Sequence, residues 1–248
     1  MKDKISIIIP FFDEINFLKR AINSVLQQSY KKFEVIIIYD NPKNKENLKL
    51  LKKFIFKKSK IKLLINKKNI GAGYSRNKGI KNSKGNYIAF LDSDDSWKKN
   101  KLFLQLKFMK KTNLLISHTS YDIIDARGNF INRRKAYDLK HMDLIKSCDV
   151  GLSTVIINRK LLNKTSLFPS LKTKEDYVLW LKISSKGITF KGLNKSLTKW
   201  TKRPKSLSSS TFQKIKDAFS VYSKYQGFNF IKTIFSVITL SLNFLIKK

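Results

Sequence analysis

The sequence predicts an α/β protein with an open, mostly parallel central sheet flanked by helices. Three observations predict it: short apolar β-branched runs, segments with helical spacing between those runs, and polar or glycine-containing turns at the boundaries. Parallel strands are covered on both faces, so they are continuously apolar and lack polar alternation. Regular alternation of strand and helix implies right-handed crossovers, and such sheets bind ligands at the carboxyl ends of their strands.

The first half of the chain carries the regular part of this pattern. Buried strands are predicted at residues 5–9, 34–39, 61–65 and 87–91. Helices are predicted between them, at residues 15–26, at 48–55 and from Gly71 onward. Asp13 is placed to cap the first helix, and Asp40-Asn41-Pro42 is a turn signal that ends the second strand.

The second half is less regular. Helices are predicted at residues 102–109 and 175–185, and strands at 114–124 and 153–157. Residues 201–210, with Pro204 and four serines, predict a mobile loop. From Gln213 the pattern is helical again, so we expect the chain to finish in a helical C-terminal extension.

The composition is that of a globular chain, with 248 residues, 42% hydrophobic and 28% charged. A wholly disordered, collagen-like or multi-span membrane protein is therefore excluded. The single cysteine, Cys148, rules out an internal disulfide and a cysteine metal cage. The apolar run at residues 5–12 contains a proline and has no small-residue cleavage site, so it is no signal peptide, and a cytoplasmic location fits best.

The charge balance is extreme. Lys and Arg number 52 against 17 Asp and Glu, which gives a net charge of +35, whereas small soluble domains usually carry a magnitude of about 2–8. Only seven of the 52 are arginine, and specific readers of nucleic acid favour arginine, so we expect no specific nucleic-acid partner. The lysine excess indicates either a binding surface or a base-composition bias of the coding genome. In both cases anionic membranes and polyanions will attract the chain.

Residues 233–246 contain no charge but are shorter than the ~20 residues that span a bilayer. Polar residues recur every three or four positions and leave an apolar face, which consists of Ile231, Ile234, Phe235, Ile238, Leu242 and Leu245. One interpretation is a helix lying on anionic lipid, and the other is a helix packed on its own domain or on a partner. The lysines that flank the segment favour the membrane surface.

Acidic residues are scarce, so the places where they gather are informative. Asp92, Asp94 and Asp95 directly follow the strand predicted at 87–91. An Asp-x-Asp at a strand's carboxyl end can hold a divalent ion and leave open positions for diphosphate oxygens. The alternative is that Asp94 or Asp95 caps a helix beginning near Trp97.

Three further segments carry polar side chains that could contribute to the same edge of the sheet. Asp40 also ends a strand, although a turn aspartate is the simpler interpretation. Gly71 to Asn77 joins flexible backbone at a helix start to Arg76, which could reach a phosphate or a base. Glu175-Asp176 opens a helix, where capping would explain the acids equally well.

Taken in order, these segments resemble glycosyltransferase family 2, the inverting enzymes of GT-A fold, and in particular bacterial members that build surface glycans. The motifs that carry the resemblance are Ile5 to Glu14, Ile37-Ile38-Tyr39-Asp40-Asn41, Asn69 to Asn77, Phe90 to Trp97 and Glu175-Asp176-Tyr177. The resemblance implies a transferase domain at residues 1–210, with a nucleotide-binding half at 1–97 and an acceptor half at 98–210. Residues 211–248 then form a basic, apolar extension.

The resemblance also implies roles for single residues. Those placed around the nucleotide sugar are Pro10, Phe12, Glu14, Asp40, Arg76 and Asp92. Asp94 matches the residue that binds the divalent metal, Mn²⁺ or Mg²⁺, and Asp176 matches the catalytic base, with Glu175 beside it. On the acceptor side, Trp97 is a contact candidate, and Arg203 either folds over the diphosphate or is a solvated loop charge.

The sequence departs from the family pattern at several positions. Tyr39 replaces the first aspartate of the usual pair, Asn41-Pro42 replaces Gly-Ser, and Asp13 stands for the more usual Asn. The Gln-x-x-Arg-Trp motif of processive synthases is absent, which favours the addition of one sugar.

The expected function is therefore inverting transfer of one sugar from a UDP-sugar or similar donor. The acceptor would be a hydroxyl of a glycan or lipid-linked molecule in cell-envelope polysaccharide or lipopolysaccharide synthesis. The enzyme would lie at the inner face of the cell membrane. The alternative is a catalytically inactive basic module that binds polyanions or membranes, with the charge as its function.

Overall fold

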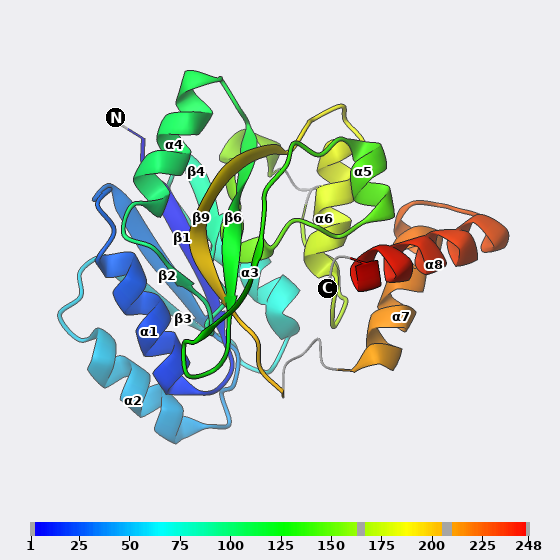
Figure 1. Cartoon of the computed structure of the whole chain (residues 1–248). Coiled ribbons are helices and arrows are strands. Elements are labelled where there is room, and N and C mark those ends of the chain that lie inside the picture. The colour runs from blue at the N-terminus through cyan, green and yellow to red at the C-terminus, as the bar shows by residue number, and fades with distance from the viewer. Residues whose placement is uncertain (1–2, 163–166, 205–209, 247–248) are drawn as a thin grey trace.

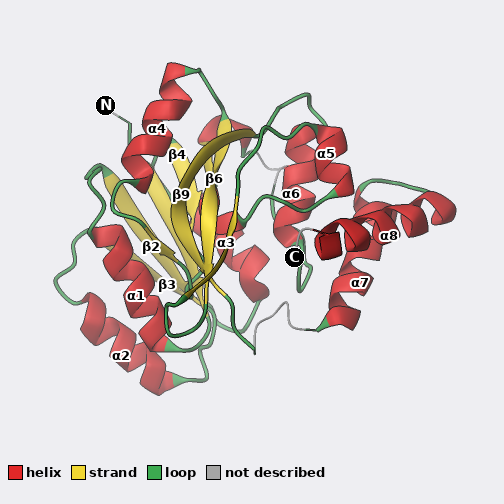
Figure 2. Ribbon diagram, in the orientation of Figure 1, coloured by secondary structure: helices red, strands yellow, loops and turns green. Residues whose placement is uncertain are grey.

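The computed structural model describes residues 3–162, 167–204 and 210–246. It confirms the predicted α/β class, with one mixed sheet between layers of helices (Figures 1 and 2). Part of the loop predicted at 201–210 lies outside the described residues. Among those described, no helix combines the length and the apolar character needed to cross a membrane.

The sheet runs through both halves of the chain in the order β3-β2-β1-β4-β8-β6-β9-β5, with β7 paired to β6. Its strands are β1 (Ile5–Phe11), β2 (Phe33–Tyr39), β3 (Ile61–Ile65), β4 (Tyr87–Phe90), β5 (Ser96–Trp97), β6 (Ile116–Ile124), β7 (Phe130–Arg134), β8 (Ile156–Asn158) and β9 (Lys191–Thr201). The first four are mutually parallel. From β8 onward the pairing is antiparallel, except between β6 and β9.

Helices cover both faces of the sheet. They are α1 (Ile15–Leu26), α2 (Lys45–Ile55), α3 (Gly71–Lys81), α4 (Lys101–Lys111), α5 (His141–Lys146), α6 (Glu175–Ser184), α7 (Thr211–Ser220) and α8 (Phe230–Ile246), with a π-helical turn η3 (Val221–Tyr225) between the last two. Successive residues of a strand point to opposite faces. In β1, therefore, Ile7 and Ile9 pack in one core with α1, α2 and α4, whereas Ile8 packs in the other with residues of α6 and η3.

The structure corrects several local expectations. Asp13 does not cap α1. The residue before the helix is Glu14, which has a left-handed conformation and makes no side-chain cap. The side chain of Asp13 instead accepts a hydrogen bond from the backbone N–H of Glu14. No helix begins near Trp97, because residues 96–97 form β5 and α4 starts only at Lys101. Ser153 lies in a short 3₁₀ turn (Leu152–Thr154) that precedes β8. Strands β7 and β9 were not predicted, because their segments lack a long apolar run.

The C-terminal extension packs in an unexpected orientation. Helix α8 packs on α5, α7 and η3. It does so through a narrow buried stripe of Thr233, Ser236 and Leu240. The predicted apolar face is exposed at all six positions, from 40% at Ile234 to 80% at Ile231. The helix does pack on its own domain, as the alternative interpretation expected, but through another face, and the apolar face stays open.

Helix α3 approaches the sheet closely because residue 79 is glycine. A Cβ atom at this position would lie 2.6 Å from Cγ2 of Ile8 and 2.9 Å from Cδ1 of Ile38, both fully buried. These branched side chains cannot retreat without disturbing the sheet. The close packing holds the last turn of α3 against β1 and β2.

We expect Gly79→Ala to lower the free energy of unfolding by about 1–3 kcal/mol, because overpacking forces the core to shift. Urea unfolding monitored by circular dichroism measures the change. Gly151→Ala is the matched control, since a Cβ there meets nothing closer than 3.5 Å. Equal stability of the two variants would contradict the packing argument.

Candidate active site

The loops at the carboxyl ends of neighbouring strands form one acidic site. The turn at Asp92–Asp95, named here the acidic turn, follows β4, and Glu14 follows β1, the strand next to it. Helices α3 and α6 add Arg76 and the pair Glu175-Asp176. The convergence follows from sheet order, because parallel neighbours end at one edge.

Arg76 is the buried centre of this site. Its Nη2 lies 2.7 Å from Oδ1 of Asp92, and its Nη1 lies 2.5 Å from Oε1 of Glu175. Burial alone would lower the pKa of Arg76, but the charges of Asp92 and Glu175 raise it above its ordinary value. The guanidinium therefore joins the acidic turn to the start of α6. Its predicted contact with a nucleotide stays a prediction, since both terminal nitrogens are already engaged.

Asp176 has the titration properties of a general base. Burial, followed by the neighbouring charge of Glu175, raises the pKa of Asp176 to about 7, while Arg76 opposes the shift. Its Oδ1 accepts a hydrogen bond of 2.8 Å from the N–H of Tyr177. Near neutral pH this carboxyl group is divided between its two protonation states, which is the condition that favours proton transfer.

The three carboxylates of the acidic turn point to different partners. Asp95 is buried and accepts hydrogen bonds from Oγ of Ser153 at 2.6 Å and from the N–H of Thr201 at 2.9 Å. Asp92 pairs with Arg76 and Asp94 with Arg203, and the metal-binding role of Asp94 stays a prediction. In the described part of the chain, no three His, Cys, Asp or Glu side chains gather as a metal site. A cation bound here would need ligands from outside the protein as well.

Asp94 fits a cation on electrostatic grounds. Burial and the charge of Asp92 raise its pKa, whereas Arg203 lowers it. Arg203 folds over the site with Nε 2.9 Å from Oδ2 of Asp94, and it also pairs with Glu14. The interpretation of Arg203 as a solvated loop charge is therefore wrong: its side chain is only 20% exposed. A positive charge beside Asp94 relieves the repulsion within the acidic turn.

The carboxylate of Asp40 is hydrogen-bonded to the start of α3. Its Oδ1 accepts hydrogen bonds from the N–H of Ile70 at 2.9 Å and from the amide of Asn66 at 2.7 Å, and its Oδ2 accepts one from the N–H of Gly71 at 2.8 Å. These bonds satisfy unpaired N–H groups at a helix N-terminus. A contact of this carboxylate with a base stays a prediction. The preceding Tyr39 is fully buried and donates its hydroxyl to the carbonyl oxygen of Asn44.

The remaining predicted residues differ in accessibility. Phe12 is 49% exposed and Pro10 is half-buried at the end of β1, so both can line a ligand site. Trp97 is only 4% exposed, and its indole N–H donates to the carbonyl oxygen of Ser153 at 2.7 Å. Because it belongs to the core under α4, it offers an acceptor almost no surface.

Three residues that hold the acidic turn in place were not predicted from the sequence. Nη2 of Arg20 and Oγ1 of Thr201 both donate to the carbonyl oxygen of Asp94, at 2.6 and 2.5 Å. Oγ of Ser153 accepts from the N–H of Asp92 at 3.0 Å while donating to Asp95. Their partners lie 58 to 107 residues away, so no local pattern could have revealed them.

Comparison with known proteins gives consistent matches. A model of glycosyl transferase family 2 matches residues 6–180. An uncharacterized glycosyltransferase of Rickettsia bellii is 42% identical over 200 residues, which are 79% of this chain but only 28% of that protein. The Escherichia coli UDP-Glc:alpha-D-GlcNAc-diphosphoundecaprenol beta-1,3-glucosyltransferase WfgD is 35% identical over 89% of this chain and 86% of its own. The crystal structure of S. aureus TarS 1-349 in complex with UDP-GlcNAc has the same fold, with a TM-score of 0.73 at 23% identity over 90% of this chain and 65% of that chain.

We expect Arg76→Met to lower the free energy of unfolding by about 3–5 kcal/mol, because it leaves the buried carboxylate of Glu175 without a partner. Chemical denaturation measures the loss. The double variant Arg76→Met/Glu175→Leu should recover much of it, since an apolar pair can replace a buried ion pair. Lys191→Met, which breaks an exposed pair with Asp138, is the control and should change stability little. No recovery in the double variant would argue against the ion pair as the cause.

Proposed function

The chain belongs to glycosyl transferase family 2, and from this we propose that it transfers a single sugar, with inversion, from a UDP-sugar to a hydroxyl group of a lipid-linked glycan. The fold is that of the GT-A glycosyltransferases. WfgD, a relative that matches over most of both chains, is named for a UDP-glucose donor and a diphosphoundecaprenol-linked acceptor. The donor and the acceptor in this name supply the donor and acceptor classes of the proposal.

The observation that carries the proposal is the linkage through Arg76. Arg76 pairs with Glu175, whose neighbour Asp176 has a pKa of about 7. It also pairs with Asp92, in the turn that contains Asp94. A transferase of this kind needs a base for the acceptor hydroxyl and positive charge near the departing diphosphate. An inactive polyanion-binding module would need neither a general base nor a cluster of carboxylates, and the presence of both in a chain with few acids argues against that alternative.

Asp176, Asp94 and Arg203 have separate roles in the proposed reaction. The Asp176 carboxylate takes the proton from the acceptor hydroxyl, whose oxygen then attacks the anomeric carbon on the face opposite the leaving group. The bond to the diphosphate breaks as the new glycosidic bond forms, so the configuration inverts and no covalent enzyme intermediate is needed. A divalent ion held by Asp94 would neutralise charge on the leaving diphosphate. Arg203, already at Asp94, supplies a further positive charge.

The C-terminal extension supports attachment to an anionic membrane surface. Its apolar face is exposed, and α7 adds Phe212 and Ile215, which are 78% and 50% exposed. Residues 211–246 contain four lysines and one acid, Asp217, which is buried. Apolar side chains next to ammonium groups match the acyl and phosphate layers of an anionic leaflet. We therefore assign this face to the cytoplasmic surface of the cell membrane.

We expect Asp176→Asn to lower kcat by about 10²–10⁴-fold, because the amide cannot accept the proton. In the wild type, kcat/KM should rise with pH through about 7, since only the deprotonated carboxylate acts, and the variant should lose this rise. Transfer from labelled UDP-sugars to membrane extracts measures both effects. Glu46→Gln, on an exposed part of α2, is the control for removal of one negative charge.

The donor site has a separate readout in calorimetry with UDP. Asp94→Asn should weaken UDP binding in the presence of Mn²⁺ and change it little in the presence of a chelator. Asp176→Asn should leave UDP affinity unchanged. A wild-type chain that binds no UDP, or an Asp176→Asn variant with full transfer activity, would falsify the proposed function.

Membrane attachment makes an independent prediction. Phe235→Ser/Ile238→Ser should reduce binding to vesicles containing phosphatidylglycerol by about tenfold or more, because both side chains are more than half exposed and would be buried in the interface. Sedimentation with vesicles measures it. Phe56→Ser/Phe130→Ser removes comparably exposed rings elsewhere and should have no effect. If the first variant keeps full vesicle binding but abolishes self-association, the face is a contact between copies of the chain.

A further inference from the structure

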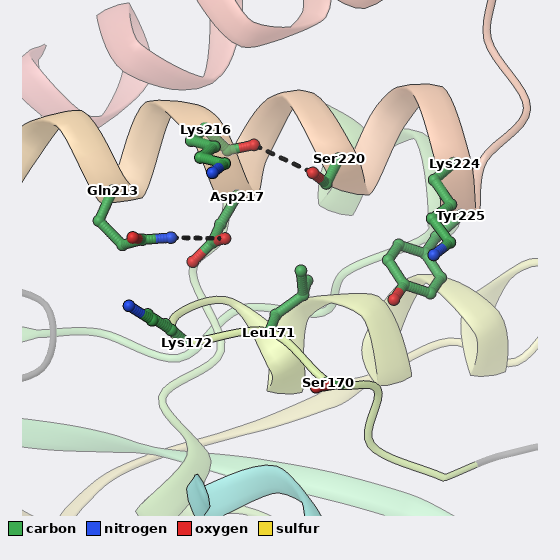
Figure 3. A pocket seen from close by; sticks show the side chains of 9 residues that line it. All are labelled: Ser170, Leu171, Lys172, Gln213, Lys216, Asp217, Ser220, Lys224 and Tyr225. Atoms are coloured by element: carbon green, nitrogen blue, oxygen red, sulfur yellow. Dashed lines mark hydrogen bonds between the residues drawn. The ribbon is translucent and has the colours of Figure 1, made fainter.

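An open pocket of about 330 Å³ lies between the segment at residues 170–172 and one face of α7 and η3 (Figure 3). Lys172 reaches it from the segment, and Lys216 and Lys224 reach it from the helices. Asp217 lies at its base, and Ser170 and Tyr225 add hydroxyl groups. We name this site the lysine pocket. None of its lining residues belongs to the acidic site.

The positive charge of the lysine pocket favours an anionic ligand. Within the described residues, none of the three lysines forms an ion pair. The carboxylate of Asp217 points into the protein: its Oδ2 accepts from both the N–H and Oγ1 of Thr173, each at 2.8 Å, and its Oδ1 accepts from the amide of Gln213 at 2.9 Å. Three ammonium groups around one carboxylate with its hydrogen bonds already made leave a net positive concave surface. A ligand with two or more negative charges matches it best.

The lysine pocket is close to the proposed base. Lys172 precedes Asp176 by four residues, so even a fully extended chain would separate their Cα atoms by at most about 14 Å. The two hydrogen bonds from Thr173 to Asp217 fix this connecting segment on α7. Lys172 and the base are thus parts of one stretch of chain that is bonded to α7, so a ligand beside Lys172 lies near Asp176.

The lysine pocket is also close to the proposed membrane face. The residues of α7 that line it recur at helical spacing, as Gln213, Lys216, Asp217 and Ser220. The exposed residues Phe212, Ile215 and Phe219 lie on a neighbouring face of the same helix. The ring of Phe219 contacts that of Phe230 at the start of α8, with centroids 6.1 Å apart. An amphiphile with its chain on the apolar side could therefore place its charged head in the pocket.

We propose that the lysine pocket binds the diphosphate of the lipid-linked acceptor. The inference rests on the proposed function and specifies which part of the acceptor the protein recognises. In such an acceptor, the sugar attached to the diphosphate carries the hydroxyl groups, so holding the diphosphate beside Lys172 places that sugar near Asp176. An anionic phospholipid offers the same phosphate chemistry, but with a single charge and no sugar. Diphosphate binding here would position the acceptor and leave the donor site untouched.

The test compares two kinds of vesicle with equal surface charge, one containing undecaprenyl diphosphate and one containing phosphatidylglycerol, both in phosphatidylcholine. The wild type should bind the diphosphate vesicles more tightly, and inorganic pyrophosphate should compete. Lys216→Gln/Lys224→Gln should weaken binding to the diphosphate vesicles by about tenfold or more and remove the preference. Lys216→Arg/Lys224→Arg should retain it. Lys107→Gln/Lys111→Gln, the same charge change on exposed positions of α4, is the matched control.

Each outcome decides the proposal. If Lys216→Gln/Lys224→Gln lost binding to both vesicle types equally, the lysines would only attract phospholipid in general, and the proposal would be overturned. A variant that kept the wild-type preference for diphosphate vesicles would overturn the proposal as well. UDP calorimetry separates this result from the proposed function, because pocket variants should bind UDP like the wild type. A wild type that binds no UDP but prefers diphosphate vesicles would refute the transferase proposal and leave the pocket assignment intact.

Discussion

The double ion pair of Arg76 is the contact on which the site depends. Its guanidinium lies between a carboxylate that follows β4 and one that opens α6, at sequence separations of 16 and 99 residues. A buried arginine is costly without both partners, and the buried Glu175 would be costly without the arginine. The three groups therefore order one another. As a result, the acidic turn and the first turn of α6 keep a fixed relation, and so do the two residues with proposed chemical roles, Asp94 and Asp176.

The acidic turn has the opposite sign of charge to the chain as a whole. The chain carries +35, yet the acidic turn concentrates carboxylates at one edge of the sheet. Their burial and mutual repulsion raise the pKa values of Asp94, Asp95 and Asp176. Three arginines, which are few in this chain, come to this site and supply compensating hydrogen bonds or charges. These are Arg20, Arg76 and Arg203. Lysine, the abundant cation, lies mainly at the surface, where it can meet anionic partners.

The C-terminal extension combines the two surface properties of the chain. α8 packs on the protein through Thr233, Ser236 and Leu240 and leaves most of its large apolar side chains exposed, whereas an ordinary surface helix buries them. α7 presents lysines on one face and aromatic residues on the next. A bilayer interface satisfies both at once, since it offers acyl chains and phosphates within a short depth. The membrane and the acceptor diphosphate would then be recognised by one structural unit beside the proposed base.

The sequence by itself determined the parts of the fold that local pattern encodes. The parallel strands and their helices were predicted because burial on both faces leaves a continuous apolar run. The order of the motifs was sufficient to identify the family. Polar-rich β9 was missed, because its pairing with β6 is set by long-range contact and leaves no periodic signal.

Only the tertiary structure decided how the site residues are used. It joined Asp40 to the start of α3, placed Arg203 on Asp94, buried Trp97 and turned the apolar face of α8 outward. The physical reason is that hydrogen bonds and ion pairs between distant segments depend on which surfaces pack together. Residue type alone limits which partners are possible, and packing selects among them.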